Sequence, residues 1–334
     1  MALEREVVLE RLTCAVQKRL GSGVTLDAVV MPTLGGSNQT VVFDVVEAGG
    51  ARRRLVSRSE TFTGTDSPFI PPSFQFKLLR AAHSRGIPVP EPVFEFDDAD
   101  GLGRGYTMGF VGGETLPKKI LNDPGLAGAR ERLTSQSGEI LARLHAIPIT
   151  ELSFLEDTAD SRDPLAAQLS RLDRYREAHP AVEVGVRWLK THPLPSAPRQ
   201  LVHGDFRTGN FIVGERGIEA VLDWECAHLG SGMEDLGWLC VRSWRFGKVD
   251  KPVGGFGLRA ELFRAYAAAS GVVPEPEVVH WWEVFGNIRW VILNVLQAYG
   301  NEFEGRRSVS YAACGRNASL YEYDLLMTLA GRYD

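Results

Sequence analysis

Apolar and β-branched residues recur in short runs over the first third of the chain, and glycine-rich breaks separate them. Residues 28–111 contain five such runs, and one segment with helical periodicity is inserted after the third. Gly49 and Gly50 lie between the second and third runs, where a glycine pair is typical of a hairpin turn. The pattern therefore predicts a five-stranded antiparallel sheet with one inserted helix.

Helical periodicity dominates on both sides of this strand-rich segment. Residues 1–20 place apolar side chains at helical spacing among acidic and basic ones and end at Gly21. This is the pattern of an amphipathic helix, not of a signal peptide or a membrane span. The C-terminal two thirds read as helices, except for two apolar runs around GERG at 214–217, which predict a small β-hairpin.

These patterns predict an α+β protein with two lobes. We expect an N-terminal lobe over 1–111, which includes the helix 1–20, and a mainly helical C-terminal lobe over 112–334. The hinge is expected near residues 108–113, and ligand sites favour the cleft between such lobes. At 334 residues the chain is long enough for this arrangement.

Composition excludes several classes of function. The formal net charge of -5 argues against a nucleic-acid-binding protein, which usually needs a basic face. The four cysteines are scattered and form no C-x-x-C pair, so they indicate neither a disulfide framework nor a zinc site. We expect a cytoplasmic protein that binds neither membrane nor nucleic acid, and the sequence leaves monomer and homodimer open.

The stretch LVHGDFRTGN, residues 201–210, carries too many functional groups for an ordinary turn. His203, Asp205 and Asn210 stand at fixed offsets, and Arg207 lies between the last two. Asp223 follows in VLDWE, at the end of the second strand of the predicted hairpin. A single Asp, Asn or His in a loop is usually a turn former or a structural residue, but the combination of offsets favours a reactive site.

Phosphoryl transfer is the chemistry that this set of residues suits. It needs a carboxylate that accepts the proton of an attacking hydroxyl and oxygen ligands that hold Mg²⁺ against the nucleotide phosphates. We assign the base to Asp205 and the metal ligands to Asn210 and Asp223. His203 is expected to brace the loop, and Arg207 is a further catalytic candidate.

The loop and the strand that follows it resemble the catalytic loop and metal-binding strand of the aminoglycoside phosphotransferase and choline kinase-like families, small-molecule relatives of protein kinases. The branch that the chain resembles includes domains fused to acyl-CoA dehydrogenases. This resemblance implies a bilobal protein-kinase-like fold and the same roles for Asp205, Asn210 and Asp223. The motifs that fall in the family's order are LGGSNQTVVFDV, IPVPEPVFEF, YTMGFVGGETL, LARLHAI, HGDFRTGN and VLDWECAHLGSGMEDLGWL.

The resemblance also implies a nucleotide site in the N-terminal lobe, with ATP as the donor and GTP as the alternative. The backbone of the hinge would face adenine, and the loop between the first two strands would cover the phosphates, with glycines that allow close approach. The corresponding residues are Met108, Gly109 and Val111 in the hinge and Gly35, Gly36, Ser37 and Asn38 in the loop.

The sequence departs from the family at the pair of residues that clamps the phosphates. Arg58 stands where the third strand carries a lysine, and Gln75 stands where the following helix carries the partner glutamate. Arg58 can still bind phosphate through its planar guanidinium, and Gln75 could position it only by a neutral hydrogen bond. A second departure places Ser231 in a motif that usually reads GDP, but Asp235 is retained and is expected to brace the catalytic loop.

The acceptor is a small-molecule hydroxyl that the sequence does not identify. From residue 251 onward nine acids stand against eight bases, and this balance does not favour a polycationic aminoglycoside. Trp281, Trp282 and Trp290 could form an aromatic cage for choline, although aromatic residues at helical spacing are usually core. A comparatively hydrophobic alcohol or a hydroxyacyl thioester is favoured by analogy with the branch, and an aminoglycoside or amino-alcohol kinase remains the alternative.

Two rival functions stay open at this point. A pseudokinase that binds nucleotide without turnover is suggested by Arg58 and Gln75. A non-haem iron oxygenase could build its metal site from His203, Asp205 and a distant His228 or His280. The mainly helical pattern after residue 115 argues against the double-sheet barrel that such an oxygenase would need.

Overall fold

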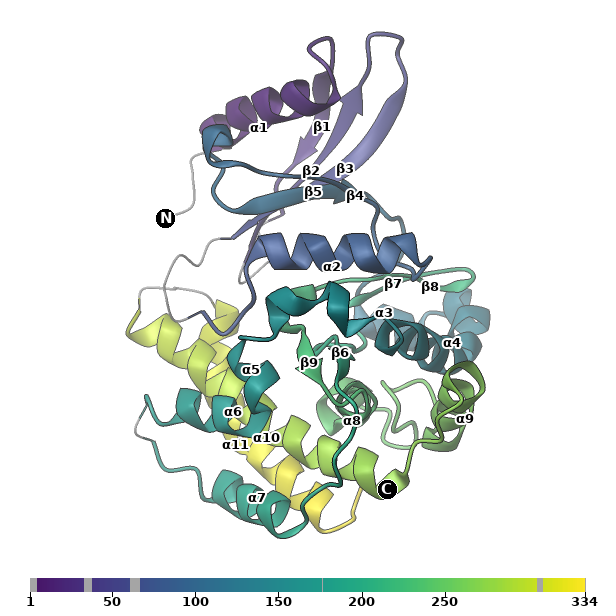
Figure 1. Ribbon diagram of the computed structural model, residues 1–334, viewed down its shortest axis with the longest axis vertical. Coiled ribbons are helices and arrows are strands. Elements are labelled where there is room, and N and C mark those ends of the chain that lie inside the picture. The colour runs from purple at the N-terminus through teal and green to yellow at the C-terminus, as the bar shows by residue number, and fades with distance from the viewer. Residues whose placement is uncertain (1–4, 33–37, 61–66, 176, 305–308, 334) are drawn as a thin grey trace. The chain divides into compact units, whose positions relative to one another are not determined.

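The computed structural model describes residues 5–32, 38–60, 67–175, 177–304 and 309–333 (Figure 1). The chain forms two compact units, and one segment near residue 223 belongs to the unit formed by the N-terminal part of the chain. Unit 1 consists of Met1–Gly112 and Ala220–Cys226, and unit 2 consists of Gly113–Glu219 and Ala227–Asp334.

Unit 1 is built on a five-stranded sheet in the order β1-β2-β3-β5-β4, in which each neighbouring pair is antiparallel. β2 and β3 form a long hairpin whose turn includes Gly50, at a φ of 82° that favours glycine. The predicted sheet with one inserted helix is confirmed. The strands are β1 (Thr25–Val30), β2 (Asn38–Val46), β3 (Arg52–Glu60), β4 (Pro92–Glu95) and β5 (Gly105–Gly109).

The described part of unit 1 also contains α-helices (Figure 1). The helix α1 (Arg5–Leu20) buries Leu12 and Val16 in a cluster with the strand residues Phe43 and Leu55. This contact is the reason that its apolar positions recur at helical spacing. The helix α2 (Pro72–Ser84) follows β3 and contacts β4 and β5.

The segment Ala220–Cys226 belongs to unit 1, although the sequence pattern places it in the C-terminal lobe. Its backbone is tied to two loops of that unit. The N–H of Ile70 donates to the carbonyl of Glu225 at 2.9 Å, and the N–H of Val221 donates to the carbonyl of Pro88 at 2.8 Å. Unit 1 therefore contains Asp223, whereas the residues of the predicted catalytic loop lie in unit 2.

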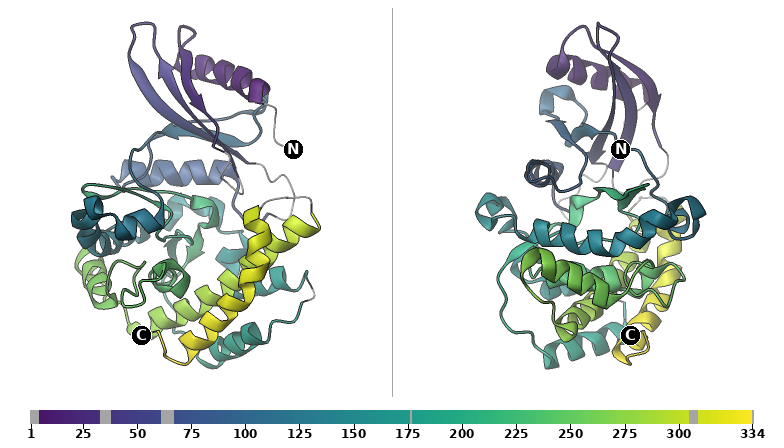
Figure 2. Two further views of the ribbon diagram at one scale, coloured as in Figure 1. Left: turned by 180° about the vertical axis from the view of Figure 1, so that it is seen from behind. Right: turned by 90° about the vertical axis from the view of Figure 1, so that its right-hand side faces the viewer.

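Unit 2 is mainly helical, with an apolar cluster around α10, and α10 runs alongside α11 (Figure 2). Two small sheets pair β6 with β9 and β7 with β8. The second is the predicted hairpin, whereas β9 has only three residues and was not predicted. The helices are α3 (Pro117–Asn122), α4 (Ala127–His145), α5 (Ala159–Arg162), α6 (Pro164–Leu172), α7 (Pro180–Thr191), α8 (Met233–Cys240), α9 (Arg259–Ser270), α10 (Pro276–Glu302) and α11 (Val309–Leu329), and the strands are β6 (Gln200–Val202), β7 (Phe211–Gly214), β8 (Gly217–Val221) and β9 (His228–Gly230).

None of the helices in the described ranges combines the length and the apolar character that a membrane crossing requires.

Candidate active site

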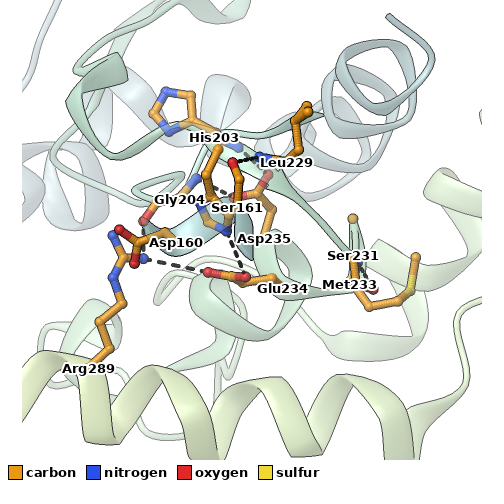
Figure 3. A network of polar contacts seen from close by, with 12 residues as sticks. Asp160, Ser161, His203, Gly204, Leu229, Ser231, Met233, Glu234, Asp235 and Arg289 are labelled. Carbon is orange, nitrogen blue, oxygen red and sulfur yellow. Dashed lines mark hydrogen bonds and ion pairs between the residues drawn. The ribbon is translucent and has the colours of Figure 1, made fainter. Parts of the chain in front are cut away.

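The loop between β6 and β7 is fixed to α8 through Asp235, which is fully buried. Its Oδ2 accepts the backbone N–H of His203 at 2.8 Å, and its Oδ1 accepts that of Gly204 at 2.9 Å (Figure 3). The Nε2 atom of His145, from α4, lies 3.2 Å from Oδ2. One carboxylate thus holds two consecutive amides directly before Asp205, which is the bracing role expected for Asp235.

Burial and hydrogen bonding act in opposite directions on this carboxyl group. Burial alone would raise the pKa of Asp235, but His145 and His203 lower it through hydrogen bonds and charge, and the net shift is downward. Asp235 is therefore an ionised carboxylate in a buried position, and its removal would leave several donors without an acceptor.

Asp205 receives hydrogen bonds at both carboxylate oxygens, and its side chain is 16% exposed. Its Oδ1 accepts from Arg207 Nε at 2.8 Å and from Trp238 Nε1 at 3.0 Å. Its Oδ2 accepts from Asn210 Nδ2 at 2.6 Å. Because the amide nitrogen of Asn210 is directed to Asp205, the carbonyl oxygen is the atom of that amide left to serve as a ligand. The base candidate is therefore held in one orientation by three side chains.

Arg207 joins the carboxylate to a group of tryptophans. Its guanidinium lies 4.4 Å from the ring centroid of Trp244, which favours a cation–π contact. The ring of Trp244 packs in turn against Trp238 and Trp290, at centroid distances of 5.1 and 4.7 Å. Trp244 and Trp238 are buried, and Trp290 is partly exposed. The aromatic group beside the base thus differs from the predicted cage, since Trp281 and Trp282 pack against the main core of unit 2.

Arg289, from α10, contacts the same loop from another direction (Figure 3). Its Nη1 donates to the carbonyl of Gly204, and its guanidinium lies 4.8 Å from the ring centroid of Trp238. Glu234 Oε1 is 3.8 Å from this guanidinium, and its Oε2 is 3.1 Å from His228 Nε2. Arg289 therefore supports both the backbone before the base and the indole that contacts the base.

His203 lies inside the loop and is fully buried. Its Nδ1 accepts the backbone N–H of Asp205 at 3.2 Å, and its ring meets that of Phe206 edge to face at 6.0 Å. This position suits a residue that shapes the loop, because the imidazole is engaged with backbone instead of facing solvent.

Unit 1 holds the other predicted half of the site. Arg58, on β3, donates from Nη2 to Asp223 Oδ1 at 2.8 Å, and the two side chains are 15% and 27% exposed. Burial lowers the pKa of Arg58, but the charges of Asp223, Tyr106 and Glu225 outweigh it and raise the pKa above the ordinary arginine value. Asp223 has a φ of 68°, in the left-handed region that residues other than glycine seldom adopt. Such strained positions are often found at functional sites.

Gln75 does not contact Arg58 in the described part of the chain. Its Nε2 donates to the carbonyl of Ile70 at 3.0 Å, and its Oε1 accepts from the hydroxyl of Tyr106 at 3.3 Å. The predicted direct hydrogen bond between Gln75 and Arg58 is therefore replaced by contacts with Tyr106 and the backbone. Glutamine and glutamate side chains have the same length, so the difference lies in orientation: the amide of Gln75 is directed to Ile70, just before α2, and to Tyr106.

The predicted hinge residues follow β5 in unit 1. Met108 is buried. The N–H of Gly109 donates to the carbonyl of Glu91 at 2.8 Å, and that of Phe110 donates to the carbonyl of Arg54 at 3.0 Å. The backbone amides of Gly109 and Phe110 thus donate to carbonyls within unit 1. Val111, the next predicted hinge residue, follows them. Of the phosphate-loop candidates, Gly35, Gly36, Ser37 and the side chain of Asn38 lie outside the described residues.

Asn210, in unit 2, and Asp223, in unit 1, each carry an oxygen of the kind that Mg²⁺ prefers as a ligand. The oxygenase alternative lacks such support. In the described ranges no three His, Cys, Asp or Glu side chains are grouped to hold one metal. His228 pairs with Glu234, and His280 packs against the ring of Trp188 at 5.7 Å.

Two residues that contact the site from α8 and α10 were not singled out from the sequence. Trp238 stands three positions after Asp235, so both occupy one face of α8, and this spacing could have indicated it. Arg289 is brought to the loop by tertiary packing of α10, and nothing in its local sequence indicates its role.

Comparison with known proteins places this geometry in context. Residues 33–280 match the phosphotransferase enzyme family. Mouse acyl-CoA dehydrogenase family member 10 is 30% identical over 221 residues, which cover 60% of this chain. The match covers 20% of that relative, so the chain corresponds to about a fifth of its length.

Solved structures share the fold at low sequence identity. A structure from Ralstonia eutropha, provisionally assigned as an aminoglycoside phosphotransferase, has a TM-score of 0.71 and 21% identity, over 96% of this chain and 97% of its own. The ternary complex of streptomycin, ATP and APH(2″)-IIa has a TM-score of 0.56 and 15% identity, over 89% of this chain and 91% of its own. These similarities support the bilobal kinase-like fold that the motifs predict.

Proposed function

Because the chain belongs to the phosphotransferase enzyme family, we propose that it transfers the γ-phosphoryl group of ATP to a hydroxyl of a small molecule. The sequence resemblance to this family is confirmed by the family match. The observation that carries the proposal is the Asp205 carboxylate, which three side chains orient within a loop that a buried carboxylate braces.

Asp205 acts as the general base in this proposal. The acceptor hydroxyl attacks the γ-phosphorus, its proton passes to Asp205, and the bond from phosphorus to the β,γ-bridging oxygen breaks, with ADP as the leaving group. Arg207 and Trp238 hold Oδ1, and Asn210 holds Oδ2. A fixed carboxylate favours the reaction because little reorientation is needed when the hydroxyl arrives. His203 keeps the loop in this shape.

Asn210 and Asp223 are proposed to ligate Mg²⁺, which would neutralise charge on the nucleotide phosphates. Arg58 is proposed to bind the phosphates in place of the usual lysine, and its guanidinium can do so through two hydrogen bonds. The hinge at Met108, Gly109 and Val111 is proposed to face adenine. ATP is the preferred donor, since the similar ternary complex contains it, and GTP is the alternative to test.

The acceptor is proposed to be a comparatively hydrophobic alcohol, with a hydroxyacyl thioester as the leading candidate. Aromatic rings of Trp238, Trp244 and Trp290 pack beside the base, where apolar contacts would bind such a molecule. The similarity to a relative named as an acyl-CoA dehydrogenase family member supports the thioester. Aminoglycosides and amino alcohols are the alternative acceptors.

An ADP-release screen tests the proposal. The purified chain, ATP and Mg²⁺ are incubated with alcohols, sugars, amino alcohols, aminoglycosides and hydroxyacyl thioesters, and hits are checked by phosphorus NMR for a new phosphate ester. Wild type is expected to phosphorylate at least one acceptor, and Asp205→Ala is expected to form no product from it. Tight ATP binding in a thermal-shift assay, without turnover on any acceptor, would instead support the pseudokinase.

A further inference from the structure

The partner of Arg58 is the open question in the nucleotide half of the proposed site. A strand cation that binds phosphates needs a fixed orientation, and the helix glutamate of the family is replaced by Gln75. Gln75 does not reach Arg58, and Asp223, which pairs with it, is assigned to Mg²⁺, so a further group is needed to orient the guanidinium. The antiparallel register of β3 and β5 indicates which group it is.

Arg58 and Tyr106 are direct cross-strand partners in that register. Side chains of such partners lie on the same face of the sheet, within reach of each other. Tyr106 is 2% exposed, although it carries a hydroxyl that needs a partner. Burial raises the pKa of Tyr106, whereas the nearby charge of Arg58 lowers it, and burial prevails. The phenol is therefore neutral at pH 7 and available for hydrogen bonding.

A chain of hydrogen bonds fixes Tyr106 in turn. Its hydroxyl donates to Gln75 Oε1, and Gln75, which is 4% exposed, donates from Nε2 to the carbonyl of Ile70. The N–H of Ile70 donates to the carbonyl of Glu225, two residues after Asp223. Asp223 itself pairs with Arg58. These contacts therefore connect Tyr106, through Gln75 and Ile70, to the segment of unit 1 that carries Asp223.

We propose that Tyr106 is the positioning residue for Arg58 and that Gln75 acts on Arg58 through Tyr106. This inference rests on the proposed function, because it assigns Arg58 to the nucleotide phosphates. The guanidinium carries several donors in a rigid plane, so it can contact Asp223 and Tyr106 and still present an N–H edge to phosphate. A lysine ammonium has no such plane.

A neutral side chain at position 75 is also consistent with the carboxylates that already accompany Arg58. Asp223 already pairs with Arg58 at 2.8 Å, and Glu225 follows it two residues later. A glutamate at position 75 would bring a third carboxylate toward a single cation, in a site that must accept an anionic nucleotide. Restoring the family's glutamate should therefore weaken nucleotide binding instead of improving it.

Nucleotide affinity, measured by titration calorimetry with ADP and Mg²⁺, tests the proposal without any acceptor. Tyr106→Phe removes only the hydroxyl and is expected to weaken binding about tenfold, the scale of one hydrogen bond to a charged group. Arg58→Lys and Gln75→Glu are expected to weaken it by a similar factor. The double variant Arg58→Ala with Tyr106→Phe should bind no more weakly than Arg58→Ala alone, because the hydroxyl acts through the guanidinium.

Tyr175→Phe is the matched control, since it removes a buried phenol from the core of unit 2 and should leave the affinity unchanged. Where an acceptor is known, Tyr106→Phe should raise KM for ATP and leave KM for the acceptor near the wild-type value. Wild-type affinity in Tyr106→Phe, or a gain of affinity in Gln75→Glu, would overturn the inference. Failure of the wild-type chain to bind nucleotide would overturn the proposed function instead.

Discussion

Replacing Asp235 with asparagine is expected to cost far more stability than an ordinary surface change of the same kind. In the wild type each carboxylate oxygen accepts one backbone N–H, from His203 or Gly204, and Oδ2 also lies 3.2 Å from His145. An asparagine amide has only one oxygen, so its NH₂ group would face one of these donors. The variant thus loses a charge-assisted contact and leaves a buried donor without an acceptor.

The magnitude follows from these two losses. A hydrogen bond to a charged group contributes about 1.5–3 kcal/mol, and a buried unsatisfied donor costs about 1–3 kcal/mol. The sum is about 2.5–6 kcal/mol, which includes the range of about 3–5 kcal/mol for removing one partner of a buried ion pair. Domains are typically stable by about 5–15 kcal/mol. The variant should therefore remain folded at low temperature, but little of its free energy of unfolding should remain at 37 °C.

Urea unfolding at pH 7 measures this loss as a lower midpoint at an unchanged slope. The control is Asp157→Asn, which also breaks an ion pair of 2.8 Å, with Arg162, but at a side chain that is 93% exposed. Solvent screens that pair, so the control should unfold close to the wild type. A loss below about 1 kcal/mol in Asp235→Asn would refute the bracing role, and so would equal losses in the two variants.

The difference in unfolding free energy between wild type and Asp235→Asn is expected to depend on pH. The pKa of Asp235 is lower in the folded chain than in the unfolded one, because its donors outweigh the effect of burial. Its contribution is therefore present above the unfolded pKa of about 4 and is lost as the pH falls through the lower folded value. The gap in unfolding free energy between wild type and Asp235→Asn should narrow below about pH 4. A gap that stays constant from pH 7 to pH 3 would contradict this.

Three further substitutions test packing and the catalytic loop. Gly138→Ala should destabilise by about 1–3 kcal/mol in urea unfolding, since the new Cβ would lie 2.7 Å from the backbone nitrogen of Tyr266. Gly128→Ala, on the open side of the same helix, should instead stabilise by about 0.5–1 kcal/mol, and a loss there would contradict the packing. Arg207→Lys should lower kcat about tenfold, because lysine lacks the planar group that contacts Asp205 and stacks on Trp244. A wild-type kcat would show that Arg207 has no such role.

The local motifs made much of the fold and of the catalytic loop predictable. His203, Asp205 and Asn210 are close in sequence, and a short loop between strands brings such residues together in almost any fold that contains it. The strands of unit 1 were predictable for a similar reason, since their apolar runs and glycine turns are local features. The antiparallel pairing follows from the short connection of β2 to β3.

The contacts that the sequence did not indicate depend on tertiary packing. Tyr106 reaches Arg58 only through the register of β3 and β5, and Arg289 reaches Gly204 only because α10 packs against α8. The assignment of Ala220–Cys226 to unit 1 depends on backbone hydrogen bonds to Ile70 and Pro88, which no local pattern reveals. Arg58 and Gln75 differ from the family's lysine and glutamate, and a comparison of these two positions does not include Tyr106. The cross-strand position of Tyr106 opposite Arg58 becomes visible only in the sheet register.

The role of Asp205 is the central claim, and paired measurements of transfer and binding test it most directly. With an acceptor from the ADP-release screen, phosphorus NMR should detect the phosphate ester with wild type and none with Asp205→Ala. Titration calorimetry with ATP and Mg²⁺ should give similar affinities for both proteins, because Asp205 is assigned to the acceptor proton and not to the nucleotide. Phosphate transfer by Asp205→Ala at the wild-type rate would contradict the account.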